Sequence, residues 1–155
     1  MIILKPDHKI QKRFPKIDFQ IMSSIFSTIF DTVYKSKKKR NHTINIKMAA
    51  GLNSYYRFQA GTNNKIHISD VIFREDIFVS TLLHEFRHFV QDKVFRIPLT
   101  KKNYDETTAK SYMDSPVEVD ATIFEQTLLC RVLDMHNKQK KDKKFFMMNS
   151  NYKGT

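Results

Sequence analysis

The chain contains few of the residues that mark linkers, disulfides and membrane segments. It has 3 Gly and 4 Pro among 155 residues, too few for an extended low-complexity linker. The single cysteine, Cys130, excludes an intrachain disulfide and a Cys-rich zinc site, and its apolar surroundings predict a buried core thiol. No stretch approaches the roughly 20 apolar residues that span a bilayer, and the N-terminal apolar run is too short for a secretory signal. These absences predict a cytoplasmic protein that does not enter the membrane.

Acidic residues are also few relative to basic ones. The chain has 16 Asp and Glu and 27 Lys and Arg, which gives a net charge of +11. Much of the excess lies in two blocks, residues 35–40 and 138–144. Such blocks predict a non-specific, salt-sensitive attraction to nucleic acid or other polyanions. The alternative is that each block is simply a solvated helix end or tail. No base-reading motif accompanies either block.

The hydrophobic fraction of 41% is that of a globular protein, and the length favours one domain. We expect a domain over residues 1–137, followed by a basic tail over 138–155. Within the domain, the apolar spacing predicts a helix over 17–34, after an irregular basic segment that ends near Lys16. Three short strands are expected between Thr43 and Ser69, the last two joined as a hairpin by turn residues that begin at Gly61.

Two further helices are expected in the second half of the chain, over 76–95 and from Pro116 onward. The polar segment from 100 to 114 is expected to form a loop between them, over the functional site. Ser115 and Pro116 suit the N-cap and first turn of the last helix. The order of elements indicates an α+β fold with an N-terminal helix, a short, twisted, mostly antiparallel sheet of about three strands, and a final pair of helices.

The most informative motif lies in the first of these two helices, where residues 84–88 have the sequence His-Glu-Phe-Arg-His. Residues i and i+4 of a helix share a face, so His84 and His88 can reach one metal ion. Glu85 is offset from them and can hold a water molecule. This is the arrangement of zinc hydrolases, and it predicts a Zn²⁺ cofactor.

Catalytic zinc usually takes a third protein ligand, and the acids that open the last helix are the natural source. Glu118 and Asp120 are separated by about 200° around a helix, so both cannot face one metal ion. Glu118 also has an alternative role, because a glutamate three residues after Ser115 completes a capping box without any metal.

Residues 84–91, His-Glu-Phe-Arg-His-Phe-Val-Gln, together with 115–121, Ser-Pro-Val-Glu-Val-Asp-Ala, and Phe124, resemble the gluzincin metallopeptidases. The resemblance is strongest to small bacterial and phage proteins with an H-E-x-R-H-x-x-Q helix, and the second motif is similar to that of ImmA/IrrE-type regulatory peptidases. It implies a zincin-like pair of active-site helices with Glu118 as the third zinc ligand and Asp120 as a supporting or exposed residue. It also implies that an extended peptide substrate adds to the strand over 65–68 as an edge.

The chain departs from three related classes. Metzincins need Gly and His where this chain has Gln91 and Val94, which excludes that class. SprT-type proteases use a third histidine, for which His136 is poorly placed. The thermolysin-type pattern needs an acid at position 122, which is Thr122 here, so we expect other groups, such as backbone carbonyls, to orient the histidines.

The sequence therefore predicts a zinc-dependent metallopeptidase in which Glu85 takes a proton from the attacking water. Tyr112, Tyr104, His67 and Arg87 are the candidates for contacts with the substrate or with the oxyanion, and packing or surface exposure is the alternative for each. The competing prediction is a basic, polyanion-binding or assembly protein that keeps a structural or vestigial zinc site.

Overall fold

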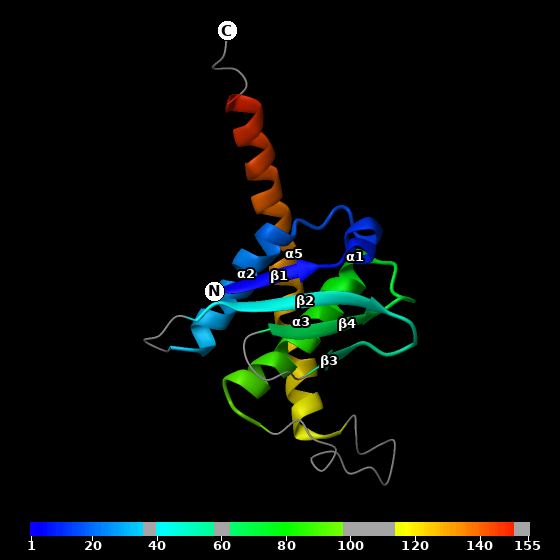
Figure 1. The fold of residues 1–155 in the computed structure, drawn as a ribbon. Coiled ribbons are helices and arrows are strands. Elements are labelled where there is room, and N and C mark those ends of the chain that lie inside the picture. The colour runs from blue at the N-terminus through cyan, green and yellow to red at the C-terminus, as the bar shows by residue number, and fades with distance from the viewer. Residues whose placement is uncertain (36–39, 58–62, 98–113, 151–155) are drawn as a thin grey trace.

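The computed structural model describes residues 1–35, 40–57, 63–97 and 114–150. The fold is α+β, with a four-stranded mixed sheet and helices on one of its faces (Figure 1). Along the chain the elements are β1 (Ile2–Pro6), α1 (His8–Arg13), α2 (Phe19–Val33), β2 (His42–Ala49), β3 (Tyr55–Arg57), β4 (Asn63–Ser69), α3 (Glu75–Lys93) and α5 (Pro116–Ser150). The helices expected over 17–34 and 76–95 and the β3–β4 hairpin are confirmed.

The sheet differs from the expectation in strand number and direction. Its order is β1-β2-β4-β3, in which β1 and β4 both run parallel to β2, and only β3 is antiparallel to its neighbour. The prediction of about three mostly antiparallel strands is therefore wrong. The strand β1 lies in the segment expected to be irregular, because Lys5 and Pro6 obscure the alternation of Ile2 and Leu4. Parallel neighbours are distant in sequence, so no turn signal announces them.

The segment over 65–68 is not an edge, since β4 pairs with β2 on one side and β3 on the other. The edges are β3 and β1. Side chains from α2 cover the outer backbone of β1: the N–H of Ile2 donates to Ser27 Oγ at 2.8 Å, and that of Leu4 donates to Ser23 Oγ at 2.9 Å. These contacts protect β1 from pairing with another strand.

One face of the sheet is apolar and packs on the helices. Alternate strand residues on this face are fully or almost fully buried: Ile2, Leu4, Ile44, Ile46, Ile66 and Ile68. They meet apolar side chains of α2 and α3, among them Met22, Phe26, Phe30, Phe78, Leu82, Phe86 and Phe89. The helix α5 packs on α3 and α2. In Figure 1 the strands lie in front of these helices, and no described helix covers the other face of the sheet.

Helix α5 begins at Pro116, as expected, but it continues through Ser150, well past the domain end expected at 137. His136 and Lys140 contact the segment before α2, since His136 Nε2 accepts from the N–H of Asp18 at 2.9 Å and Lys140 donates to the carbonyl of Lys16. The last part of α5 (red in Figure 1) extends beyond the other elements. Residues 151–155 of the expected tail lie outside the described residues.

Cys130 is exposed on α5, so the expectation of a buried thiol is wrong. Its apolar neighbours Leu128, Leu129 and Val132 face the core, while Cys130 lies on the solvent side of the same helix. None of the helices in the described ranges is long and apolar enough to cross a membrane.

Asp18 is the N-cap of α2, and its loss has a measurable cost. Its carboxylate accepts from the N–H groups of Gln20 and Ile21 at 3.0 and 3.1 Å, and from Lys143 Nζ at 2.9 Å. We expect Asp18→Ala to lower the free energy of unfolding by about 1 kcal/mol, because the cap hydrogen bonds disappear. Urea denaturation measures this. The control is Asp31→Ala on the exposed side of the same helix, and an equal loss in both variants contradicts the capping role.

His42 lies in the core between two aromatic rings, with ring-centroid distances of 5.4 Å to Phe30 and 5.5 Å to Phe89. Its Nδ1 has no hydrogen-bond partner among the described residues. Burial lowers the pKa of His42, and the nearby positive charges of the N-terminus, Lys93 and Arg40 lower it further. His42 is therefore neutral in the folded protein.

This neutral histidine makes stability dependent on pH. In the unfolded chain His42 takes up a proton near its ordinary pKa of 6.5, whereas the folded protein resists protonation to a lower pH. Acidification below that value consequently favours unfolding. We expect His42→Phe to reduce the loss of stability between about pH 7.5 and 5.5. Denaturation curves at both pH values measure the change. The exposed control is His8→Gln. If His42→Phe alters the pH dependence of stability no more than this control does, the role of His42 is contradicted.

Candidate metal centre

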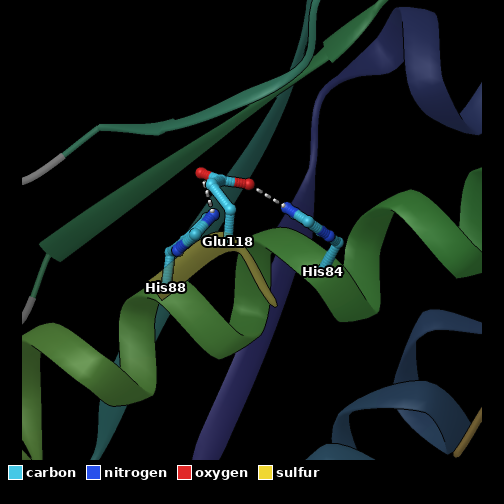
Figure 2. A group of neighbouring side chains, drawn as sticks. All are labelled: His84, His88 and Glu118. Carbon is cyan, nitrogen blue, oxygen red and sulfur yellow. Dashed lines mark hydrogen bonds and ion pairs between the residues drawn. The ribbon is translucent and has the colours of Figure 1, made fainter. Parts of the chain in front are cut away.

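His84 and His88 lie one turn apart on α3, with their imidazole rings edge to face and their ring centroids 5.0 Å apart. Both side chains leave the same side of the helix, as the spacing requires (Figure 2). His88 is almost fully buried and His84 is partly accessible, with side-chain exposures of 8% and 19%. The helix thus presents two ring nitrogens to one point.

Glu118, in the first turn of α5, places its carboxylate between the two rings (Figure 2). Its Oε2 lies 3.0 Å from Nε2 of His84, and its Oε1 lies 3.2 Å from Nε2 of His88. The carboxylate does not close the capping box, and the hydroxyl of Ser115 has no partner within the described part of the chain. Of the two acids at the start of this helix, Glu118 is the one that meets the histidines.

The ligand atoms of His84, His88 and Glu118 all lie within 4.8 Å of one another, which is close enough to hold one metal ion. Tetrahedral zinc with bonds of about 2.0–2.1 Å has ligand atoms about 3.3 Å apart, and each imidazole has one oxygen of Glu118 near that distance, Oε2 for His84 and Oε1 for His88. Oε1 of Glu118 is buried, and its contact at 3.2 Å with Nε2 of His88 lacks good hydrogen-bond geometry, so a cation would stabilise this oxygen better than the contact does. Two imidazoles and one carboxylate also form a known donor set for catalytic zinc. The residues therefore fit the ion.

The second nitrogen of each imidazole has a side-chain partner. His84 Nδ1 lies 3.1 Å from Oε2 of Glu125, whose other oxygen accepts from the hydroxyl of Ser80. His88 Nδ1 lies 2.8 Å from Oε1 of Gln91. With both Nδ1 atoms engaged, each ring directs its Nε2 toward the carboxylate of Glu118.

The expectation that groups other than an acid at position 122 orient the two histidines is confirmed, but these groups are the carboxylate of Glu125 and the amide of Gln91 and not backbone carbonyls. The sequence contained a signal for Glu125: it lies seven residues after Glu118, two helical turns along nearly the same face. Gln91 is held in turn, since its Nε2 donates to the carbonyl of Val117 at 2.9 Å and to Asp120 Oδ2 at 2.8 Å.

Arg87 and Asp120 form an ion pair beside the site. Arg87 Nε and a terminal nitrogen donate to the two oxygens of Asp120 at 2.7 and 3.1 Å. The guanidinium also lies over the rings of Phe95 and Phe124, at 5.2 and 5.0 Å from their centroids. These contacts connect α3 to α5, and they commit Arg87 to packing rather than to the substrate. Asp120 supports Gln91, in agreement with one of its two expected roles.

Glu85 lies outside the group of three side chains but near it, and its carboxylate reaches β3. It is only 6% exposed, and its carboxylate accepts a hydrogen bond from the backbone N–H of Tyr56 in β3. Burial raises the pKa of Glu85 above its ordinary value, even though the two neighbouring histidines oppose the shift. Such a carboxyl accepts a proton at a higher pH than an exposed glutamate does.

The three grouped residues influence one another's protonation. Burial alone would lower the pKa of His84 and His88, but hydrogen bonding to Glu118 and the negative charges of Glu85 and Glu118 outweigh it and raise both pKa values. Burial alone would raise the pKa of Glu118, but its contacts with the two histidines hold it well below the ordinary value. A metal ion must therefore compete with protons for both Nε2 atoms.

His67 is not near this site, which corrects its candidacy for the oxyanion. Strand residues alternate between faces, and Ile66 and Ile68 point toward the helices. His67 consequently lies on the opposite face, where its ring stacks on Tyr55 at 4.5 Å. Tyr104 and Tyr112, like the expected loop that contains them, lie outside the described residues.

Comparison of the chain with protein-family models, with curated proteins and with solved structures found no match. The functional assignment of this site therefore depends on its own residues and geometry.

The orienting role of Glu125 has a measurable consequence. We expect Glu125→Ala to weaken zinc binding by about 10- to 100-fold, because the imidazole of His84 loses the partner that fixes its direction. Competition with a colorimetric zinc chelator measures this affinity. The control is Gln126→Ala, an exposed neighbour on the same helix, which should bind zinc like the wild type. Equal affinities for all three proteins would contradict the role of Glu125.

Proposed function

We propose that the protein is a zinc-dependent metallopeptidase, with His84, His88 and Glu118 as metal ligands and Glu85 as the general base. The observation that carries the proposal is the convergence of three side chains from two helices, together with a separate buried carboxyl one residue after the first ligand. A site that only stabilises the fold needs no such carboxyl. The zincin-like helix pair implied by the resemblance to gluzincins is part of this proposal.

A zinc ion held by His84, His88 and Glu118 would supply Lewis-acid chemistry and would lower the pKa of a bound water molecule. Glu85 takes the proton from the attacking water and later gives it to the leaving amine. Its burial favours both steps, because the raised pKa brings the carboxyl closer to the pH at which it works. The N–H of Tyr56 keeps the carboxylate directed at the sheet edge.

The position of Glu85 also supports an extended peptide as the substrate. With the segment over 65–68 inside the sheet, the free edge nearest to α3 is β3. An extended peptide that adds to this edge as a further strand would replace Glu85 as the acceptor for the N–H of Tyr56, in the middle of β3, and would therefore lie beside that carboxyl. In our proposal β3 therefore replaces β4 as the strand that aligns the substrate.

A proteome-derived peptide library tests the proposal without knowledge of the sequence that is cleaved. The zinc-loaded protein is expected to generate new peptide termini, detected by mass spectrometry. Cleavage should stop with a zinc chelator and return when zinc is added. One zinc ion per chain without cleavage of any peptide would instead support the alternative, a polyanion-binding or assembly protein with a structural zinc site.

A further inference from the structure

We propose that the uncovered face of the sheet binds single-stranded nucleic acid. The basic sheet face, as we name this surface, consists of Lys5, Lys47, Lys65, Arg57, Tyr55 and His67. None of these residues belongs to the two lysine- and arginine-rich blocks of the sequence or to the group of His84, His88 and Glu118. The inference does not depend on the proposed peptidase activity.

The strand register brings these residues together from four separate segments. Lys5 pairs with Asn45, Asn45 with Lys65, and Lys65 with Arg57, which forms one row across the sheet. Lys47, His67 and Tyr55 form the adjacent row. Neighbouring strands lie about 4.8 Å apart, so the first row crosses roughly 14 Å. This face is turned toward the viewer in Figure 1, away from helices α2, α3 and α5.

The charge on this face has a single sign. Its remaining described members on β1 and β2 are Ile3, Thr43, Asn45 and Ala49, so no acidic side chain of these two strands alternates with the cations. The environment of His67 is consistent with this arrangement: burial lowers its pKa first, and the charges of Arg57, Lys47 and Lys65 lower it further. Three cations therefore act on one imidazole from three different strands. A chain of phosphates complements such a surface.

The aromatic pair favours nucleic acid over other polyanions. The rings of Tyr55 and His67 are stacked, with centroids 4.5 Å apart and planes inclined by 15°. Tyr55 is 46% exposed, so part of its ring is open to a further stacking partner. Unpaired bases stack on aromatic side chains of open sheets while cations hold the backbone. An anionic membrane fits less well, because Ile3 is the only large aliphatic side chain among these residues and it is half-buried.

Fluorescence anisotropy with a labelled oligothymidylate of about 12 nucleotides tests the proposal on the full-length, zinc-loaded protein, a length that covers a typical single-strand site. We expect binding at low salt that weakens as salt rises. The plot of log K against log salt has a negative slope. The variant Lys47→Gln/Arg57→Gln should make this slope less steep by about 1.4, because each lost phosphate contact removes about 0.7.

The matched control is Lys138→Gln/Lys141→Gln, which removes the same charge from exposed positions of α5. The control should keep the wild-type slope. If the slope of the control became less steep by as much as that of the sheet variant, net charge alone would explain binding, and the proposal would be overturned. Absence of binding at low salt would also overturn it.

Stacking is tested separately from charge. We expect Tyr55→Leu to weaken binding by about 5- to 100-fold and Tyr55→Phe to bind within about twofold of the wild type, since only phenylalanine keeps an aromatic ring. Equal affinities for the Leu and Phe variants, or equal affinity of the wild type for a duplex of the same length, would contradict a surface that stacks unpaired bases. Zinc content, measured in every variant, should remain one ion per chain, which separates this result from any change at the metal centre.

Discussion

The variant Glu85→Gln is expected to bind zinc like the wild type and to lose at least about 10²- to 10⁴-fold in kcat/KM on any peptide that the wild type cleaves. Glutamine has nearly the same shape, and its side-chain oxygen can still accept the hydrogen bond from the N–H of Tyr56. It cannot take up a proton from water. Zinc titration and the hydrolysis rate of a cleaved peptide measure the two properties on the same preparation.

The matched control is Glu75→Gln, which changes the same residue type in the first turn of the same helix. It should leave both zinc binding and hydrolysis unchanged. A Glu85→Gln protein that cleaves as fast as the wild type would remove Glu85 from the mechanism. Loss of zinc in this variant would show that Glu85 is a ligand, which contradicts its separate position beside β3.

The variant His88→Ala is expected to weaken zinc binding by more than about 100-fold, because loss of an orienting partner alone already costs about 10- to 100-fold. His88 is one of two nitrogen ligands, and Glu118 would keep a buried oxygen without the atom 3.2 Å away. Competition with a zinc chelator measures the affinity, and circular dichroism confirms that the variant is folded.

His67→Ala is the control for this variant, since it removes a histidine from the opposite face of the sheet. It should keep the wild-type zinc affinity. If His88→Ala retains zinc, or if both variants lose it to the same extent, the proposed ligand set is wrong.

The residues grouped at the metal centre were predictable because helical spacing is a local rule. The i, i+4 separation of His84 and His88 fixes their common face, and the proline and serine before Glu118 place it in a first turn. The choice between Glu118 and Asp120 was not local. It required the packing of α5 on α3, which the resemblance supplied and the structure shows through the contacts of Glu118 with both imidazoles.

The partners of the two imidazoles show where sequence reasoning fell short. Glu125 looks like any solvated acid on an amphipathic helix until Ser80 and His84 are placed opposite to it. Gln91 lies on α3, the helix that carries His84 and His88. Its role in orienting His88 depends on hydrogen bonds to Val117 and Asp120 of α5. Hydrogen-bond partners from distant segments have no fixed sequence spacing.

The sheet was predicted less well than the helices for a similar reason. The antiparallel strands β3 and β4 are close in sequence, so the turn residues between them were enough to predict their pairing. The pairing of β1 with β2 connects residue 2 with residue 42. Two helices lie between these residues in the sequence, so no local pattern predicts the pairing. The same gap explains why the face of His67 could not be assigned, because only the complete strand order shows which side the helices cover.

X-ray absorption at the zinc edge tests the central claim most directly. The zinc-loaded protein is expected to show two imidazole nitrogens at about 2.0–2.1 Å and oxygen ligands at about 2.0–2.2 Å, one from Glu118 and one from water. His88→Ala should remove one of the imidazole contributions. A zinc shell with fewer than two imidazoles in the wild type, or a shell that His88→Ala leaves unchanged, would contradict the proposed site.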